Sequence, residues 1–215
     1  LETVERDIEV LRAMNLQLAY TVETHLHADH ITGALRLKQK LGSRIAVPAM
    51  DRLDCADMGL EEGIPLQLGA ITLEPLHTPG HTATHHAYLL RQDGLARLFS
   101  GDALLIDACG RTDFQSGDAG KLYDSIHSKF FSLPSETLVY PAHDYEGRFV
   151  STIAQEMNRN PRLGGDKGRD EFIAIMNNLN LPYPRKIDYA VPGNQLCGRC
   201  PDNVPEGYRE RCLQG

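Results

Sequence analysis

The chain has 215 residues, 41% of them hydrophobic, and it carries 29 acidic against 22 basic side chains, for a formal net charge of -7. This composition is typical of a globular protein long enough to bury a core, and it excludes disordered and fibrous classes. The acidic balance disfavours non-specific nucleic-acid binding, which needs a basic surface. No apolar run approaches the roughly 20 residues of a membrane span.

Helical and strand-like patterns alternate along the first half of the chain. Val4, Ile8 and Leu11 form the apolar stripe of the first helix, and Asp93-Gly94 is a strong signal for a tight hairpin turn. The predicted elements are a helix over 2–15, a strand over 16–23, a helix over 31–40, a strand over 44–47, a loop or short helix over 51–62, a hairpin over 66–76 and a second hairpin over 86–91 and 96–100.

The second half begins with an irregular segment over 101–120, and long loops of this kind in compact domains are usually functional. We then predict a helix over 121–131, a strand over 137–140, helices over 149–158 and 169–178, and irregular structure from residue 182 onward. Hairpins mixed with crossover helices indicate sheets covered by helices.

The most informative segment is THLHADH, from Thr24 to His30, between a predicted strand and a predicted helix. A tight turn there brings His25, His27, Asp29 and His30 around one point. Burying so many polar groups is costly unless a cation pairs with them. The alternative is a solvated polar turn, and the recurrence of ligand types after later strands argues against it.

Three later residues share this placement at a strand end. His81 lies in the turn TPGHT, Asp102 follows a strand in SGD, and His143 follows another in PAHD. Catalytic groups belong on such loops, where a rigid sheet holds them. His127, in the middle of a predicted helix, is instead expected to have a structural role.

In this order the motifs HxHxDH, TPGHT, SGD and PAH resemble the metallo-β-lactamase superfamily. That resemblance implies an α+β fold, the αββα sandwich, with a metal site at one edge between two sheets. THLHADHITGA, GDALLIDACGRTDF, YPAHDY, NPRL and NLNLP further resemble the ETHE-type persulfide dioxygenases, from about Val22 to Gly198. We expect a metallo-β-lactamase-like domain over 1–198 that lacks the family's first strands, and a C-terminal tail over 199–215.

The resemblance leaves two metal arrangements open. A dinuclear superfamily site would hold one ion with His25, His27 and His81, a second with Asp29, His30 and His143, and bridge them with Asp102. The persulfide dioxygenases instead imply one Fe(II) per chain, bound by His25, His81 and Asp102, which are then the catalytic residues. Two histidines and one carboxylate leave positions open for water, substrate and O₂.

In the iron hypothesis the enzyme is a non-haem dioxygenase that oxidises glutathione persulfide with O₂ to sulfite and glutathione. By resemblance, Tyr145 and Arg162 contact glutathione, and Cys197 lies near the substrate cavity. A second layer of residues surrounds the iron ligands and comprises His27, Asp29, His30, His143 and Arg111. Arg111 is expected to brace the loop after Asp102 by pairing with Asp113.

Two other functions remain open at this point. One is a dinuclear zinc thioesterase like glyoxalase II, which would hydrolyse S-lactoylglutathione; that branch shares the histidine motif but is not similar through GRTDF or NLNLP. The other is a metal-binding sensor or an inactive interaction protein. We expect no nucleic-acid or membrane partner, a homodimer as the oligomer that family members often form, and a cytoplasmic location in a bacterium or a mitochondrial one in a eukaryote.

The five cysteines are odd in number and irregular in spacing, which argues against a disulfide framework and favours a reducing compartment. Cys197 and Cys200 have the CxxC spacing of redox and zinc sites. An isolated CxxC is a weak signal, and an unpaired tail is the alternative.

Overall fold

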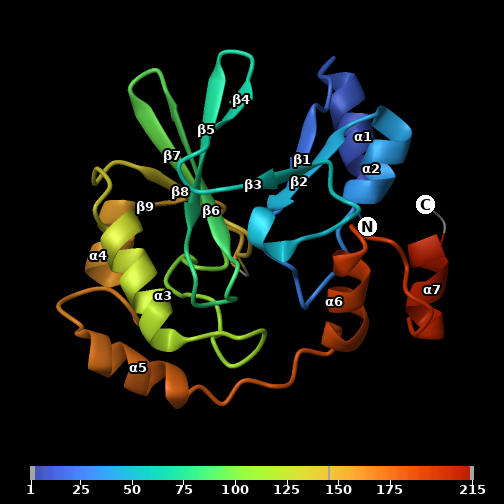
Figure 1. Cartoon of the computed structure of the whole chain (residues 1–215). Coiled ribbons are helices and arrows are strands. Elements are labelled where there is room, and N and C mark those ends of the chain that lie inside the picture. Colours follow the sequence, from blue (N-terminus) through green and yellow to red (C-terminus); the bar gives the residue numbers. More distant parts are fainter. Residues whose placement is uncertain (1–2, 145, 214–215) are drawn as a thin grey trace. The chain divides into compact units, whose positions relative to one another are not determined.

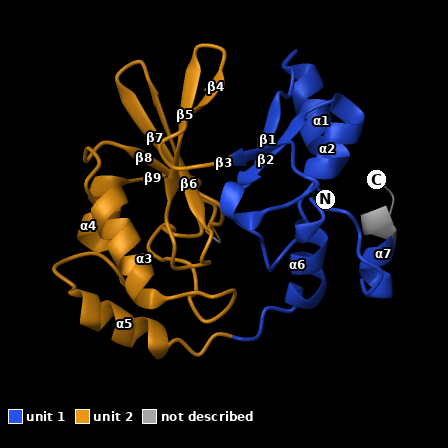
Figure 2. Cartoon of the chain, viewed as in Figure 1, with its two compact units in different colours: residues 1–59, 182–215 blue, residues 60–181 orange. Residues whose placement is uncertain are grey.

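The computed structural model describes residues 3–144 and 146–213, with side chains described as far as residue 209. The chain divides into two compact units, residues 1–59 with 182–215 and residues 60–181 (Figure 2). The last 34 residues therefore belong to the same unit as the first 59.

The first unit contains a three-stranded sheet, in the order β1-β2-β3, together with four α-helices of the described chain. β1 and β2 are parallel, with Thr21 opposite Ile45. Its elements, labelled in Figure 1, are α1 (Val4–Ala13), β1 (Tyr20–Val22), α2 (Ala34–Leu41), β2 (Arg44–Pro48), the 3₁₀ turn η1 (Ala49–Asp51), β3 (Met58–Leu60), α6 (Ile187–Gln195) and α7 (Glu206–Leu213).

Burial in this unit follows the apolar pattern of the sequence. Val4 and Ile8 of α1 are buried, and in β2 only Arg44 is exposed while the remaining strand residues are buried. Gly42 ends α2 because it adopts a φ of 73°, which an L side chain rarely tolerates, and its N–H bonds to the carbonyl of Lys38.

A six-stranded sheet, in the order β4-β5-β6-β7-β8-β9, forms the second unit. All neighbouring strands are antiparallel except β7 and β8. The strands are β4 (Leu66–Leu68), β5 (Ile71–His77), β6 (His86–Gln92), β7 (Leu95–Gly101), β8 (Leu138–Pro141) and β9 (Ser151–Thr152). Asp93 and Gly94 both have positive φ, as the predicted two-residue turn between β6 and β7 requires.

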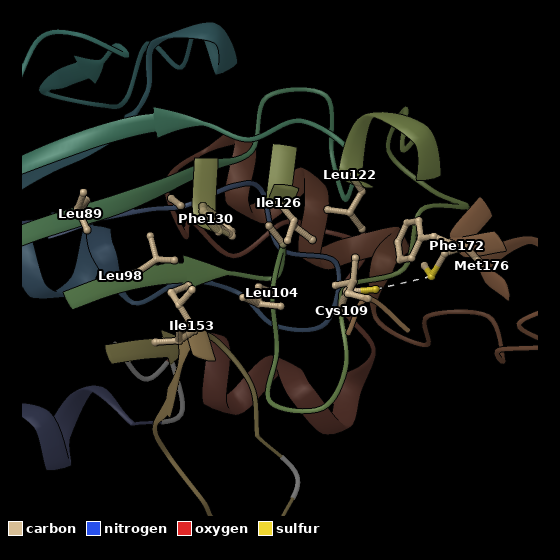
Figure 3. Packing of buried hydrophobic residues seen from close by; sticks show 14 residues of the cluster. Leu89, Leu98, Leu104, Cys109, Leu122, Ile126, Phe130, Ile153, Phe172 and Met176 are labelled. Atoms are coloured by element: carbon tan, nitrogen blue, oxygen red, sulfur yellow. Dashed lines mark hydrogen bonds between the residues drawn. The ribbon is translucent and has the colours of Figure 1, made fainter. Parts of the chain in front are cut away.

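Helices of the second unit bury their apolar side chains against this sheet. They are α3 (Ala119–Ser125), the π-helical turn η2 (Ile126–Phe130), α4 (Ile153–Arg159) and α5 (Arg169–Asn177). Figure 3 shows Leu89 and Leu98 of the sheet in one cluster with Leu122, Ile126 and Phe130. These five side chains are 0–1% exposed, so strands β6 and β7, which lead to the site below, have a rigid support.

Most predicted elements are present, but three predictions were wrong. The predicted helix over 149–158 contains the strand β9, and α4 begins only at Ile153. Residues 51–62 contain the strand β3, and the stretch from 182 onward contains the helices α6 and α7. Pro192 and Gly193 lie inside α6 and hid it, because both residues disfavour helices. Burial of Tyr189, Ala190, Gly193 and Asn194 offsets that local preference. The single domain over 1–198 stays a prediction.

The expectation that the cysteines form no disulfide was also wrong. Cys55 and Cys197 are bonded, with their Cα atoms 6.0 Å apart, so Cys197 does not pair with Cys200. Cys109 is buried as a free thiol. The sequence could not show this pairing, because the two residues are 142 positions apart and meet only after folding. No helix among the described residues is long and apolar enough to cross a bilayer.

We predict that Cys55→Ala lowers the melting temperature under non-reducing conditions. Closing a separation of 142 residues is worth at most about 5 kcal/mol in the chain-entropy treatment of disulfides. Differential scanning calorimetry measures the change, and mass mapping of the unreduced wild type should find the peptide that joins Cys55 to Cys197. An unchanged melting temperature with no cross-linked peptide would show that this bond does not form.

Candidate metal centre

Residues 23–33 connect β1 to α2 and form neither helix nor strand. His25 is 2% exposed and His27 is 7% exposed, whereas Asp29 is exposed. The Nδ1 atom of His25 lies 2.9 Å from the hydroxyl of Thr24. Burial of two neighbouring imidazoles is the feature that the sequence predicted for a metal-binding turn.

Three of the four residues expected to meet in this turn, His27, Asp29 and His30, form a group that could hold a metal ion. One ligand atom from each lies within 4.8 Å of the others, as a shared metal ion requires. The Nδ1 atom of His30 lies 3.1 Å from Oδ1 of Asp29, and the rings of His27 and His30 are 4.3 Å apart. Nearby, burial raises the pKa of Glu23, whose Oε2 atom lies 3.8 Å from Nε2 of His27.

The sheet of the second unit brings together the other three predicted residues. His81 follows β5, Asp102 follows β7 and His143 follows β8. Nε2 of His81 lies 3.5 Å from Oδ2 of Asp102, and Nε2 of His143 lies 3.5 Å from Oδ1 of the same carboxylate. β5 and β7 both run antiparallel to β6, and β8 is parallel to β7, so these three strands end at the same edge of the sheet and place both rings on one carboxylate.

Hydrogen bonding fixes which nitrogen of His81 can bind a metal. Its Nδ1 atom lies 2.7 Å from the carbonyl of Arg111, and a carbonyl only accepts, so Nδ1 carries the proton. In the neutral ring the lone pair is therefore on Nε2, the atom that faces Asp102. Metal-binding histidines usually show this pattern, with the second nitrogen donating to a carbonyl or carboxylate.

His85 is a residue whose role the sequence did not reveal. It is fully buried, its Nε2 atom accepts the N–H of Asp102 at 3.2 Å, and its Nδ1 lies 2.7 Å from the hydroxyl of Thr78. Both nitrogens are engaged, so His85 positions the backbone of Asp102 and is not a ligand. Its place at the start of β6, opposite the turn that holds His81, is the only signal that the sequence offered.

The loop after Asp102 is held closely against the ligands. The N–H of Gly110 bonds to the carbonyl of Asp102 at 2.8 Å. The predicted pairing of Arg111 with Asp113 is present, with two hydrogen bonds of 2.7 Å, and this ion pair lowers the pKa of Asp113. The Arg111 guanidinium also lies 4.6 Å from the centroid of the Phe114 ring.

The three predicted substrate contacts have different outcomes. Tyr145 lies outside the described residues. Arg162 is half-buried and donates to the carbonyl of Cys109 at 2.8 Å, which leaves other guanidinium donors for a ligand. Cys197 is 2% exposed and bonded to Cys55, so it has no thiol to offer. Burial raises the pKa of Cys109 to about 11, so that thiol stays protonated near neutral pH.

Comparison with known proteins agrees with this geometry. The family model of the metallo-beta-lactamase superfamily matches residues 2–143. The crystal structure of ETHE1 from Myxococcus xanthus has a TM-score of 0.86 and 46% sequence identity, over 92% of this chain and 85% of that one. The chain belongs to the metallo-beta-lactamase superfamily, and the predicted fold class is confirmed.

Within the superfamily the relatives are more specific. The human mitochondrial persulfide dioxygenase ETHE1 is 46% identical over 199 residues, which cover 92% of this chain and 76% of that protein. The chain therefore belongs to the ETHE1 persulfide dioxygenases, a family of enzymes. A hydroxyacylglutathione hydrolase from Pseudomonas putida (strain W619) is 38% identical, but over only 57% of this chain and 46% of that protein.

We predict that Gly110→Ala weakens metal binding and lowers stability. An added Cβ would lie 2.2 Å from the carbonyl oxygen of Asp102 and 2.8 Å from Nδ1 of His81, so the loop must move away from both. Isothermal titration with Zn²⁺ and thermal melting measure the two effects. Gly168→Ala is the matched control, because its added Cβ meets no atom within 4 Å. Equal metal affinity in both variants would contradict the prediction.

Proposed function

We propose that this chain is an Fe(II)-dependent persulfide dioxygenase that oxidises glutathione persulfide with O₂ to sulfite and glutathione. His25, His81 and Asp102 would be the iron ligands and the catalytic residues. The observation that carries the proposal is the approach of His81 Nε2 to the Asp102 carboxylate, with the opposite ring nitrogen bound to a carbonyl. Membership of the ETHE1 family supports the reaction.

The donor set fits one non-haem iron. Two imidazoles and one carboxylate are the ligands of the facial arrangement found in iron oxygenases, which leaves coordination positions for substrate and O₂. In His81 the Nδ1 atom donates to the carbonyl of Arg111, so Nε2 would bind the ion. His25 is buried, with its Nδ1 atom 2.9 Å from the hydroxyl of Thr24. When bound, the iron would supply a redox centre at which a sulfur ligand and O₂ can meet.

The surrounding residues would orient the ligands. His143 approaches the second oxygen of Asp102 and would hold the carboxylate in one rotamer. His27, Asp29 and His30 would accept or donate hydrogen bonds to water and to bound groups, and Arg111 would hold the loop whose carbonyl fixes the His81 tautomer. Groups of this kind commonly change metal affinity or activity when they are mutated.

The overall reaction balances without a further reductant. Glutathione persulfide, O₂ and water give glutathione and sulfurous acid, which ionises to sulfite, so both dioxygen atoms reach the terminal sulfur. That sulfur is oxidised and O₂ is reduced. The sulfur–sulfur bond breaks. The proton of the persulfide S–H group and the two protons of water are distributed between glutathione and sulfurous acid.

Glutathione carries two carboxylates, and an arginine fork suits their bidentate capture. Arg162 would bind one of them with the guanidinium donors not used on Cys109. Tyr145 would add a second polar contact. Cys197 would contribute only packing while it is bonded to Cys55.

A dinuclear zinc thioesterase is the second candidate, favoured by the group His27, Asp29 and His30, which could hold another ion. The two functions are separated by substrate. With glutathione persulfide and iron-loaded protein we expect O₂ uptake and sulfite in a one-to-one ratio, and with S-lactoylglutathione no hydrolysis above background. Thioester hydrolysis by zinc-loaded protein without O₂ uptake by the iron form would overturn the proposal.

The place of action and the assembly also remain proposals. The human, bovine and mouse relatives are named as mitochondrial proteins. We propose a mitochondrial location if the source is a eukaryote, a cytoplasmic one if it is a bacterium, and a homodimer, which sedimentation of the purified protein would test.

We predict that His81→Ala loses bound iron. The change removes one of two imidazole ligands, and a site with one imidazole and one carboxylate binds Fe(II) weakly. Elemental analysis after anaerobic loading and desalting should give about one iron per wild-type chain and less than about a tenth of that in the variant, since lost ligand contacts cost well over a kcal/mol each. His127→Gln is the control. It also removes an imidazole, but that ring stacks on Tyr123 and is not one of the proposed iron ligands. Full iron retention by His81→Ala would remove His81 from the ligand set.

Arg162→Ala should raise the KM for glutathione persulfide about tenfold or more with a smaller change in kcat, because one charged hydrogen bond to a substrate carboxylate is lost. Steady-state O₂ uptake measures both constants. Arg159→Ala is the matched control, since that arginine pairs with Asp107 and its side chain is 54% exposed. An Arg162→Ala enzyme with wild-type KM would exclude Arg162 from the substrate site.

A further inference from the structure

The loop that carries His25, His27, Asp29 and His30 has no helix or strand of its own over residues 23–33. A metal site needs its ligands held to about half an ångström, and loops achieve this only through supporting contacts. The support here comes from the other end of the chain. Both the loop and helix α6 belong to the unit drawn in blue in Figure 2.

Asn194, near the end of α6, makes three hydrogen bonds to this loop. Its Nδ2 atom donates to the carbonyl of His27 and to the carbonyl of His30, both at 2.8 Å. Its Oδ1 atom accepts the N–H of Thr32, also at 2.8 Å. Asn194 is 4% exposed, so these bonds are not in competition with water. One side chain therefore fixes the two ends of the His27–His30 turn and the backbone of Thr32, two residues beyond it.

An asparagine is suited to this task because its amide has two N–H donors and one acceptor oxygen on a short side chain. An aspartate of the same size would keep the acceptor but place a carboxylate oxygen against two carbonyl oxygens. An alanine would leave the two carbonyls and one N–H without this partner, and burying such groups without their hydrogen bonds is costly.

The segment that carries Asn194 is itself tightly seated. The N–H of Leu35 bonds to the carbonyl of Cys197 at 3.1 Å, and the disulfide joins Cys197 to Cys55. Gly198 has a φ of 100°, and an added Cβ would lie 2.3 Å from the carbonyl of Thr32. Ile31 packs against Tyr189 and Ala190 of α6. These contacts fix the position of Asn194, so that its side chain can hold the loop in one conformation.

We infer that Asn194 is a positioning residue that sets the conformation of the His25–His30 loop and thereby the metal affinity of the enzyme. The inference rests on the proposed function only in taking this loop as a source of ligands. The role is distinct from general stabilisation, because two of the three hydrogen bonds end on the backbone of His27 and His30, in the loop that carries the proposed iron ligand His25.

The test is a Co(II) titration of metal-free protein, followed by visible absorption, with melting temperatures measured with and without Co(II). Asn194→Ala and Asn194→Asp should bind Co(II) about 10–100-fold more weakly, the usual effect of removing a supporting contact. The rise in melting temperature on Co(II) binding should be smaller in these variants, because they bind the ion more weakly. A merely structural role would lower the melting temperature of the metal-free form and leave that rise unchanged.

Asn203→Ala is the matched control, because this exposed asparagine donates one hydrogen bond to the carbonyl of Asp188 in the same unit. Its Co(II) affinity should equal that of wild type. If Asn194→Ala does not fold, Asn194→Asp decides, since it keeps the side-chain volume and the acceptor for Thr32. A folded Asn194 variant whose Co(II) affinity lies within twofold of wild type would overturn the inference.

The result is separable from the proposed reaction. If the wild type binds Co(II) but its iron form does not oxidise glutathione persulfide, the proposed function fails and the comparison of Asn194 variants stands. If the wild type oxidises the persulfide and the variants keep full metal affinity, the role of Asn194 fails and the function stands.

Discussion

The candidate metal centre is built around one carboxylate that faces two imidazoles at the end of the six-stranded sheet. Asp102 lies 3.5 Å from Nε2 of His81 and 3.5 Å from Nε2 of His143. Buried polar groups are costly without partners, and a cation shared between a carboxylate and neutral ring nitrogens relieves that cost. The carbonyl of Arg111 fixes the tautomer of His81, and the ring of His85 holds the backbone of Asp102. Metal binding here therefore depends on the tautomer of His81 and on where the strands end, as well as on which residue types are present.

The hydrophobic core makes this arrangement possible. Leu89 and Leu98 of the central strands are buried against Phe130 and its neighbours (Figure 3), so the ends of β6 and β7 have fixed positions. The other predicted ligands depend on a different kind of support. Their loop has no regular structure, and three hydrogen bonds from Asn194 replace the sheet. One half of the candidate site is thus positioned by packing, and the other by a single amide.

Most strands and the candidate metal ligands could be predicted from the sequence. Strand-like patterns predicted most of the strands, Asp93-Gly94 predicted a hairpin, and ligand types at later strand ends predicted that His81, Asp102 and His143 belong to one site. Contacts between distant segments could not be predicted in the same way. Nothing near Cys55 points to Cys197, and nothing near His27 points to Asn194, because both pairs meet only in the folded chain. Helix α6 was missed since Pro192 lowers its local propensity, while burial of Tyr189 and Ala190 stabilises it.

The central claim is that one iron ion is held by His25, His81 and Asp102. Anomalous diffraction from crystals of the iron-loaded wild type, recorded on both sides of the iron absorption edge and again at the zinc edge, tests it most directly. We expect a single iron peak per chain, bonded to one ring nitrogen of each histidine and to the Asp102 carboxylate. Two zinc peaks bridged by Asp102, with His27, Asp29, His30 and His143 as further ligands, would contradict it.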